Sequence, residues 1–129
     1  MEKNNKIALI TGASSGIGRD MARDLAGRGY NLILVARDKE RLEELKKEFK
    51  VEVTTISTDL AVSNNCKELY REVKAKFGKI DILINNAGFG EFGFFTETNL
   101  DKEISLINTN ITAVHILMKL FLKDMKEEN

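Results

Sequence analysis

The sequence predicts an α/β protein in which a single parallel sheet is covered by helices on both faces. Four short runs rich in β-branched residues and leucine alternate with segments of helical periodicity, which is typical of repeated β-α-β units. Right-handed crossovers then give a doubly wound sheet with strand order 3-2-1-4. The length of 129 residues suits one domain, and apolar residues, at 43%, are numerous enough for a buried core.

The predicted strands are near-continuous apolar runs, which suit parallel strands buried on both faces. They comprise Lys6–Ile10, Asn31–Val35, Val51–Ile56 and Asp81–Ile84. Amphipathic stretches between them predict three helices. Their apolar positions are Ile17, Met21 and Leu25 in the first, which ends near Gly27, then Leu42, Leu45 and Phe49 in the second, and Leu69, Val73 and Phe77 in the third.

A long helix is predicted from about Asn99 to Lys126, after the fourth strand. An apolar seam follows it at alternating spacings of three and four residues, formed by Ile104, Ile107, Ile111, Val114, Met118, Phe121 and Met125. A second apolar side is formed by Leu106, Ala113, Leu117 and Leu120. Two arrangements remain open. Either one side covers the sheet and the other meets a partner, or the whole helix is buried.

A glycine-rich segment, TGASSGIG at residues 11–18, follows directly on the first predicted strand, and a helix starts inside it. A phosphate needs backbone N–H groups at a helix N-terminus and a close approach of the chain. Gly12, Gly16 and Gly18 lack the Cβ atoms that would block this approach, and Ser14 and Ser15 add hydroxyl donors. The segment therefore predicts a dinucleotide-binding turn, and an ordinary tight strand-to-helix turn is the alternative.

The second predicted strand ends at Ala36, Arg37 and Asp38. In folds specific for NAD an acidic residue at this strand end holds the ribose hydroxyls, whereas an arginine suits a 2′-phosphate. Arg37 follows the strand tip, and because its guanidinium fork matches a phosphate we expect NADP to be preferred over NAD. Asp38 fits the N-cap of the next helix better than a ribose contact. The alternative for Arg37 is a solvated surface side chain.

Four motifs in this order resemble the short-chain dehydrogenase/reductase family. They are TGASSGIG, Asp59-Leu60 after the third strand, Asn85-Asn86-Ala87-Gly88 after the fourth, and Asn110 in the long helix. The resemblance covers nearly the whole chain and implies a Rossmann-type, dinucleotide-binding domain over residues 1–129. It implies no metal.

The resemblance also assigns roles residue by residue. The glycine-rich turn, Ile17 included, is implied to bind the cofactor. The residues that match Asp59 and Leu60 line the adenine pocket in the family. Those that match residues 86–88 run along the cofactor, and the asparagine that matches Asn110 holds a water molecule in a proton relay, which makes Asn110 the one expected catalytic residue.

The family reaction moves a hydride between nicotinamide and a carbonyl or alcohol carbon, with the help of a serine, a tyrosine and a lysine four residues after the tyrosine. In the family these three lie on elements after the long helix, where this sequence ends, and its only tyrosines are Tyr30 and Tyr70. Tyr70 and Lys74 match the Tyr-x-x-x-Lys spacing but precede the NNAG strand, so we reject them as a catalytic pair.

We therefore expect an NADP(H)-preferring oxidoreductase that acts on a small carbonyl or alcohol substrate in its full-length form. The present chain is expected to be a truncated, incomplete domain, ending after the fourth strand and the long helix, without turnover of its own. Two alternatives remain open. One is a non-catalytic, stand-alone nucleotide-binding or interaction module, and the other is an enzyme half completed in trans by a partner.

Charge and composition exclude several other classes. Twenty basic residues balance twenty acidic ones, so no net charge favours nucleic acid or an anionic membrane. No stretch reads as a signal peptide or a membrane span. Cys66 is the only cysteine, which excludes an internal disulfide, favours the cytoplasm and suggests a passive, at least half-buried thiol.

We expect the isolated chain to form a homo-oligomer. In the family, a further strand lies beside the one that matches residues 81–84, so the strand edge at residues 80–84 and the long helix at 99–126 are both expected to be open for association. The phenylalanine-rich segment 89–95 predicts either an apolar substrate wall or a packing cluster between this loop and the long helix. His115 has no catalytic or metal partner by spacing and is expected to pack or to face solvent.

Overall fold

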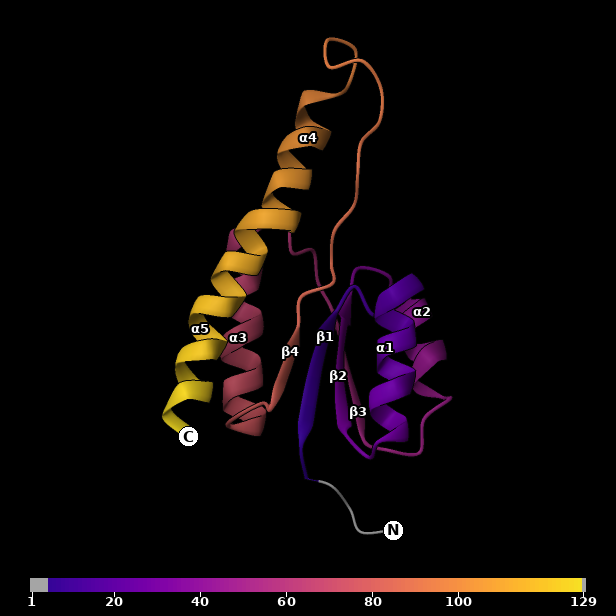
Figure 1. The fold of residues 1–129 in the computed structure, drawn as a ribbon, viewed down its shortest axis with the longest axis vertical. Coiled ribbons are helices and arrows are strands. Elements are labelled where there is room, and N and C mark those ends of the chain that lie inside the picture. The colour runs from indigo at the N-terminus through magenta and orange to yellow at the C-terminus, as the bar shows by residue number, and fades with distance from the viewer. Residues whose placement is uncertain (1–4, 129) are drawn as a thin grey trace.

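The computed structural model describes residues 5–128 and confirms the predicted doubly wound α/β fold (Figure 1). The elements follow one another as β1 (Ile7–Thr11), α1 (Gly16–Gly27), β2 (Asn31–Ala36), α2 (Lys39–Lys46), β3 (Val53–Ser57), α3 (Ser63–Phe77), β4 (Ile82–Ile84), α4 (Leu100–Ile107), η1 (Asn108–Thr112) and α5 (Ala113–Glu128). The start of the chain, where no signal peptide is expected, lies partly outside the described residues.

The four strands form one parallel sheet in the order β3-β2-β1-β4, as predicted. The central strand β1 pairs with β2 through Leu9 and Ile33, and with β4 through Leu9 and Leu83. The strand ends differ from the prediction by one or two residues, because pairing with a neighbour sets them. Strand β3, for example, starts at Val53 opposite Leu32, not at Val51.

The core consists of two layers, one on each face of the sheet. Helices α1 and α2 cover one face, and α3 and α5 cover the other (Figure 1). Alternate residues of the central strands enter opposite layers. Leu9, Ile33 and Val35 pack with α3 and α5, whereas Ala8, Ile10, Leu32 and Leu34 pack with α1 and α2. Burial on both faces is thus confirmed for β1 and β2, while β3 and β4 are mostly half-buried.

Helix α1 does not bury the face that its large apolar residues predict. Its buried residues are Gly18, Ala22 and Leu25, whereas Ile17 is 68% exposed and Met21 is 39% exposed. The apolar pattern through Ile17 and Met21 thus predicts the helix correctly but does not mark its buried face. Small residues on the inner face let the helix lie close to the sheet. This close approach, and not the size of the apolar side chains, decides which face of the helix is buried.

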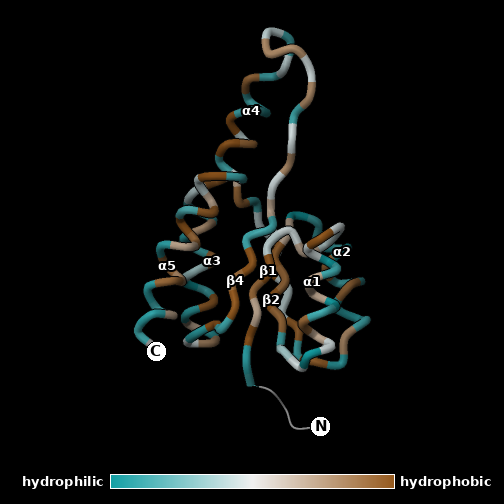
Figure 2. Tube along the Cα trace, in the orientation of Figure 1, coloured by the Kyte–Doolittle hydropathy of each residue, from teal (hydrophilic) through white to brown (hydrophobic). Residues whose placement is uncertain are grey.

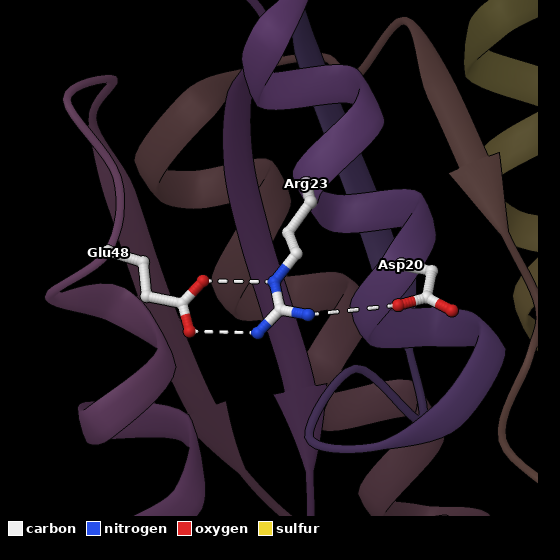
Figure 3. Close-up of polar contacts among 3 residues, drawn as sticks. All are labelled: Asp20, Arg23 and Glu48. Atoms are coloured by element: carbon white, nitrogen blue, oxygen red, sulfur yellow. Dashed lines mark hydrogen bonds and ion pairs between the residues drawn. The ribbon is translucent and has the colours of Figure 1, made fainter.

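Helix α2 and its surroundings follow the prediction closely. Asp38 is the N-cap of α2, and Leu42 and Leu45 are buried, while Phe49 lies beyond the end of the helix and packs against the same layer. A fork of hydrogen bonds holds α1 to the segment that follows α2 (Figure 3). In this fork, Arg23 Nε and Nη2 each donate a hydrogen bond of 2.9 Å to one of the two carboxylate oxygens of Glu48.

The long helix begins after its predicted cap, Asn99, whose side chain accepts a hydrogen bond from the Lys102 amide at 2.9 Å. It is not a regular α-helix throughout, because residues 108–112 form a π-helical turn between α4 and α5. The α5 residues that face α3 and the sheet are Ala113, Leu117 and Phe121, all buried.

The long helix is not wholly buried, so the alternative in which the whole helix lies in the core is wrong. Its exposed apolar residues are Leu100, Ile104, Ile107, Ile111, Met118 and Leu122. Helix α4 and the loop before it extend past the end of the sheet, where no described element covers them (Figure 1). Figure 2 shows hydrophobic residues on this extension as well as along the strands.

The same helix bears on the expected absence of a membrane span. The segment Leu100–Glu127 has 28 residues and a mean hydropathy of 1.3 over its most apolar part, so by length and composition alone it is able to cross a membrane. One such helix is a weak indication, because core helices of soluble proteins meet the same criteria. The absence of a membrane span therefore stays a prediction.

Candidate functional site

A cavity of about 650 Å³ opens at the carboxyl ends of the strands. The strand order reverses between β1 and β4, and in open α/β sheets ligands bind in the crevice at this reversal. The cavity is lined by most of the residues proposed from the sequence to bind a cofactor: Gly12, Ser14, Ser15, Arg37, Asp59, Leu60, Asn86, Ala87 and Gly88. The residues proposed from the sequence that do not line it are Gly16, Ile17, Gly18 and Asn110.

The Thr11 hydroxyl joins the end of β1 to the segment after β4. It accepts hydrogen bonds from the backbone amides of Asn86 and Ala87, each at 2.9 Å, and donates to the Ile84 carbonyl at 3.4 Å. The side chain is buried, so these bonds satisfy a polar group that would otherwise be costly to bury. Thr11 was not among the site residues predicted from the sequence. The available signal was a single polar residue at the end of an otherwise apolar strand.

Two glycines make the close approach between the first turn and the NNAG segment possible. Gly12 has φ +64°, and a Cβ there would lie 2.9 Å from the Ala87 Cα. A Cβ at Gly18 would lie 2.5 Å from the Asn86 Nδ2, and closer still to the Gly12 carbonyl oxygen. That oxygen already accepts a hydrogen bond from Asn86 Nδ2 at 3.2 Å. Gly18 thus shapes the cavity from behind without lining it.

The first turn of α1 lies beside the cavity. Ser15 is its N-cap in extended conformation, and its side chain makes no capping hydrogen bond. The amides of a first helical turn lack intrahelical partners and carry partial positive charge, which suits an anion. Gly16 has φ +55° with open space around it, so its backbone conformation is what favours glycine. Ile17 points to solvent instead of into the cavity.

Two arginines and one aspartate lie at the end of β2. Arg37 is exposed and lines the cavity, as does Arg41 in the first turn of α2. Asp38 caps α2, because its Oδ1 accepts a hydrogen bond from the Arg41 amide at 3.1 Å. The predicted capping role of Asp38 is confirmed. Arg41 was not among the site residues predicted from the sequence, because it is the helical turn after the N-cap that brings it back toward the strand end.

The segment after β3 forms another part of the cavity wall. Asp59 Oδ1 accepts a hydrogen bond from the Ala61 amide, and its carbonyl accepts one from Asn65 Nδ2, both at 2.9 Å. Leu60 is buried with its side chain in the α3 layer. This turn leads directly into α3, so the sheet edge and the helix start hold it on both sides.

Asn110 lies in the π-helical turn and binds the loop that follows Gly88. Its Oδ1 accepts a hydrogen bond from the Phe89 amide at 3.0 Å, and its Nδ2 donates to the Phe89 carbonyl at 2.8 Å. A Cβ at Gly88 would lie 2.6 Å from the same Oδ1. The side-chain amide is therefore occupied by backbone, and the neighbouring Thr109 lines the cavity in its place. The proton-relay role of Asn110 stays a prediction.

Tyr70 and Lys74 share a partner on α5 and lie outside the cavity. The Tyr70 hydroxyl donates to Asp124 Oδ2 at 2.5 Å, and Lys74 Nζ lies 3.3 Å from that oxygen. The hydrogen bond to Asp124, together with burial, raises the pKa of Tyr70 to about 12. A proton-transferring tyrosine near neutral pH needs its pKa lowered. The geometry supports our rejection of this pair.

Other candidate groups have structural surroundings. Cys66 is buried, its Sγ lies 3.4 Å from the Leu60 carbonyl oxygen, and burial raises the pKa of its thiol, in line with a passive role. His115 is exposed. Among residues 5–128, no group of three or more His, Cys, Asp or Glu side chains is placed to hold a metal ion.

The phenylalanine-rich loop is not a packing cluster, so that alternative is wrong. Phe92, Phe94 and Phe95 are 92%, 78% and 84% exposed. The loop runs beyond the end of the sheet to the start of α4 (Figure 1). Phe92, Phe94 and Phe95 therefore form no buried cluster there, whereas Phe89 is half-buried and lines the cavity.

The sequence and fold match a known family. The family model for short chain dehydrogenases matches residues 6–129. The chain belongs to this family. A curated relative, a 3-oxoacyl-(acyl-carrier-protein) reductase of Staphylococcus epidermidis, is 38% identical over 114 residues, which are 85% of this chain and 47% of the relative. The chain spans about half the length of the curated relatives it matches.

Solved structures of the family have the same fold. L-sorbose reductase from Gluconobacter frateurii, in complex with NADPH and L-sorbose, superimposes with a TM-score of 0.87 at 33% identity, over 97% of this chain and 49% of that one. A metagenomic short-chain oxidoreductase in complex with NADP gives a TM-score of 0.92 at 32% identity, over 98% of this chain and 59% of that one.

Proposed function

We propose that residues 1–129 form the dinucleotide-binding domain of an NADP(H)-preferring oxidoreductase. The observation that carries this proposal is the cavity at the carboxyl ends of the strands, which has Arg37 in its wall and the first turn of α1 beside it. A helix N-terminus suits a pyrophosphate, and a guanidinium at the end of the second strand suits a 2′-phosphate. Relatives with this fold were solved with NADP or NADPH, which supports the same ligand here.

The remaining contacts of the cofactor follow from the cavity wall. We assign the adenine end to the turn at Asp59 and Leu60, and the path toward the nicotinamide to residues 86–88, because these segments lie on either side of the glycine turn in the sheet order. Gly12 and Gly18 keep the backbone of this turn close to the end of β4. The proposed cofactor site includes no metal ligand.

Calorimetric titration of the chain with NADPH and with NADH tests the cofactor assignment. One set of charge-assisted hydrogen bonds contributes about 1.5–3 kcal/mol, so NADPH is expected to bind roughly ten- to a hundredfold more tightly. Arg37→Ala is expected to remove most of that difference and to leave NADH binding unchanged. Equal affinities for the two cofactors in the parent chain would contradict the NADP assignment.

The full enzyme is proposed to move a hydride between the nicotinamide carbon and a carbonyl or alcohol carbon of a small substrate. The bound cofactor supplies the hydride chemistry, while this chain holds the cofactor and, through Asn110, fixes the loop at Phe89 beside the cavity. The chain alone is expected to show no turnover, because a hydride step without a positioned acid loses about 10²- to 10⁴-fold in rate. NADPH oxidation over a panel of carbonyl compounds is the measurement. Robust activity that Tyr70→Phe abolishes would show that our rejection of Tyr70 is wrong.

We also propose that the chain associates with itself through the exposed face of the long helix. The other candidate surface, the edge of β4, is only three residues long and half-buried, and Ile80 is buried, not exposed as expected. Short edge strands resist pairing with other chains. In light scattering after size exclusion, Met118→Glu is expected to shift the chain toward monomer without unfolding it, whereas Leu117→Glu, at a buried position, is expected to unfold it.

The outcome for Met118→Glu decides between the two surfaces. An oligomer that survives this substitution would exclude the helix face, and a sharp monomer peak of the parent chain across a tenfold concentration range would exclude association altogether. We keep the cytoplasm as the proposed location because the only cysteine is a buried free thiol.

A further inference from the structure

Arg41 is held by Asp38 in a way that orients its guanidinium. The Arg41 amide donates to one carboxylate oxygen of Asp38, and Arg41 Nε lies 3.4 Å from the other. Both oxygens of Asp38 are thus directed at a single residue. Among residues 5–128 the Arg41 side chain forms no further ion pair or hydrogen bond, so its two terminal nitrogens remain available to a ligand.

The pairing also changes the role of Asp38. An unpaired carboxylate beside the end of β2 would repel a phosphate and would suit ribose hydroxyls. Here the charge of Asp38 is balanced by Arg41. The side chain of Arg37, which directly precedes Asp38, has no partner among the described residues. The wall of the cavity at this point therefore carries two guanidinium groups against one carboxylate.

A second cavity adjoins the first at this place. It lies between α1 and α2 and shares Ser14 and Arg41 with the first cavity. Arg19 Nε, in its wall, is buried and has no hydrogen-bond partner within the described part of the chain. The Glu48 carboxylate in the same wall is bound by Arg23 (Figure 3), and this bond holds the pKa of Glu48 below its usual range. Glu40 and Glu44 also line this cavity, with Lys47 Nζ 3.0 Å from Glu44, so its wall is of mixed charge, and the excess of guanidinium groups lies at the first cavity.

We propose that Arg41 is the second arm of a two-arginine clamp for the 2′-phosphate of NADP(H), with Asp38 as its positioning residue. The inference rests on the proposed function, since it concerns the same cavity. A phosphate monoester is close to dianionic at neutral pH and accepts forked hydrogen bonds from more than one guanidinium. NAD(H) has a hydroxyl at this position, which gives Arg41 no charged partner.

Calorimetric titration of the chain with NADPH and NADH, before and after Arg41→Ala, tests the clamp. Arg41→Ala is expected to weaken NADPH binding by about tenfold or more and to change NADH binding by less than about twofold. Arg28→Ala is the matched control, because Arg28 Nε is also held by an aspartate, Asp24, on an exposed helix surface outside the cavities described above. It is expected to change neither affinity.

A double-mutant cycle tests the positioning role of Asp38. Asparagine is as good an N-cap as aspartate, so Asp38→Asn keeps α2 intact while it removes the charge. In the Arg41→Ala background, Asp38→Asn is expected to strengthen NADPH binding, because an unbalanced carboxylate is lost. With Arg41 present the same change is expected to give a smaller gain or a loss. Equal effects in both backgrounds would overturn the positioning role.

The outcomes separate this inference from the proposed function. A parent chain that prefers NADPH, and that keeps its full preference after Arg41→Ala but loses it after Arg37→Ala, would overturn the clamp and leave the proposed function standing. Equal weakening of NADPH and NADH by Arg41→Ala would also overturn it, because that pattern indicates a structural role. A parent chain that binds neither dinucleotide would overturn both.

Discussion

Replacing Gly18 with alanine tests the close contact between α1 and the end of β4. The added Cβ would lie 2.5 Å from Asn86 Nδ2 and closer still to the Gly12 carbonyl oxygen, whereas favourable contacts between heavy atoms need about 3.5–4.0 Å. The obstructing groups are a backbone carbonyl and an amide hydrogen-bonded to it. Neither is the free end of a flexible side chain, so the helix or the NNAG segment must move by about 1 Å.

The magnitude follows from two opposing contributions. Overpacking in a close-packed interior costs about 1–3 kcal/mol, and the gain in helix propensity from glycine to alanine offsets up to about 1 kcal/mol of it. A net loss of about 1–2 kcal/mol lowers the melting temperature by roughly 3–10 °C for a chain of this size. NADPH affinity is expected to fall as well, because the displaced segments form the cavity wall.

Guanidinium unfolding of Gly18→Ala and of Gly27→Ala, at the other end of the same helix, is the assay. A Cβ at Gly27 meets no atom within 4 Å, so alanine there is expected to raise the free energy of unfolding by about 0.5–1 kcal/mol. The two substitutions share chemistry and helix and differ in their surroundings. An unfolding free energy of Gly18→Ala at or above that of the parent would refute the contact that we describe.

Three further substitutions or modifications test other features. Asn110→Ala removes both hydrogen bonds to the Phe89 backbone, so it is expected to lower the free energy of unfolding by about 1–2 kcal/mol in denaturant titration; an unchanged value would show that water replaces both bonds without cost. Tyr70→Phe removes the bond to Asp124 and is expected to destabilise the chain by about 0.5–1 kcal/mol at neutral pH. Because the folded pKa of Tyr70 is raised to about 12, its contribution is complete below the ordinary tyrosine pKa of about 10 and is lost as pH rises through 12. The stability difference between parent and Tyr70→Phe must therefore shrink from pH 10 to 12, and a constant difference would contradict the assignment. Cys66 is buried and its thiol pKa is raised by burial, so a thiol-specific reagent is expected to modify the native chain at least about a hundredfold more slowly than the denatured chain, and similar rates would show that the site is open.

The fold could be predicted because its signals are local. Each strand is a continuous apolar run, and the alternation with helices, together with right-handed crossovers, leaves few possible sheet orders. The inner face of α1 could not be predicted in the same way. Hydrophobicity favours Ile17 and Met21, but the distance to the sheet, set by contacts with distant segments, selects Gly18 and Ala22. The inner face of a closely packed helix consists of small residues, and small residues give only a weak signal in the sequence.

The residues of the candidate site likewise fall into those with a local sequence signal, which could be predicted, and those that depend on distant contacts, which could not. The glycine turn and Arg37 could be proposed because each follows a predicted strand directly. Thr11 and Arg41 could not, since the role of Thr11 depends on amides far along the chain and that of Arg41 on the side-chain geometry of Asp38. The π-helical turn at Asn110 was likewise out of reach, because it differs from an α-helix by a change of hydrogen-bond partner and not by composition.

The hydrogen bonds of the Thr11 hydroxyl have a consequence for folding during synthesis on the ribosome. The amide partners of this hydroxyl lie 75 and 76 residues later in the chain. At a synthesis rate of about 5–20 residues per second, β1 waits roughly 4 to 15 s before its partners are made, and parallel pairing over such separations is slow. During this interval the nascent β1 edge is open to aggregation or to a chaperone. A dinucleotide that binds only the closed junction stabilises it by mass action, so cellular cofactor concentration would govern how much of the newly made chain stays open.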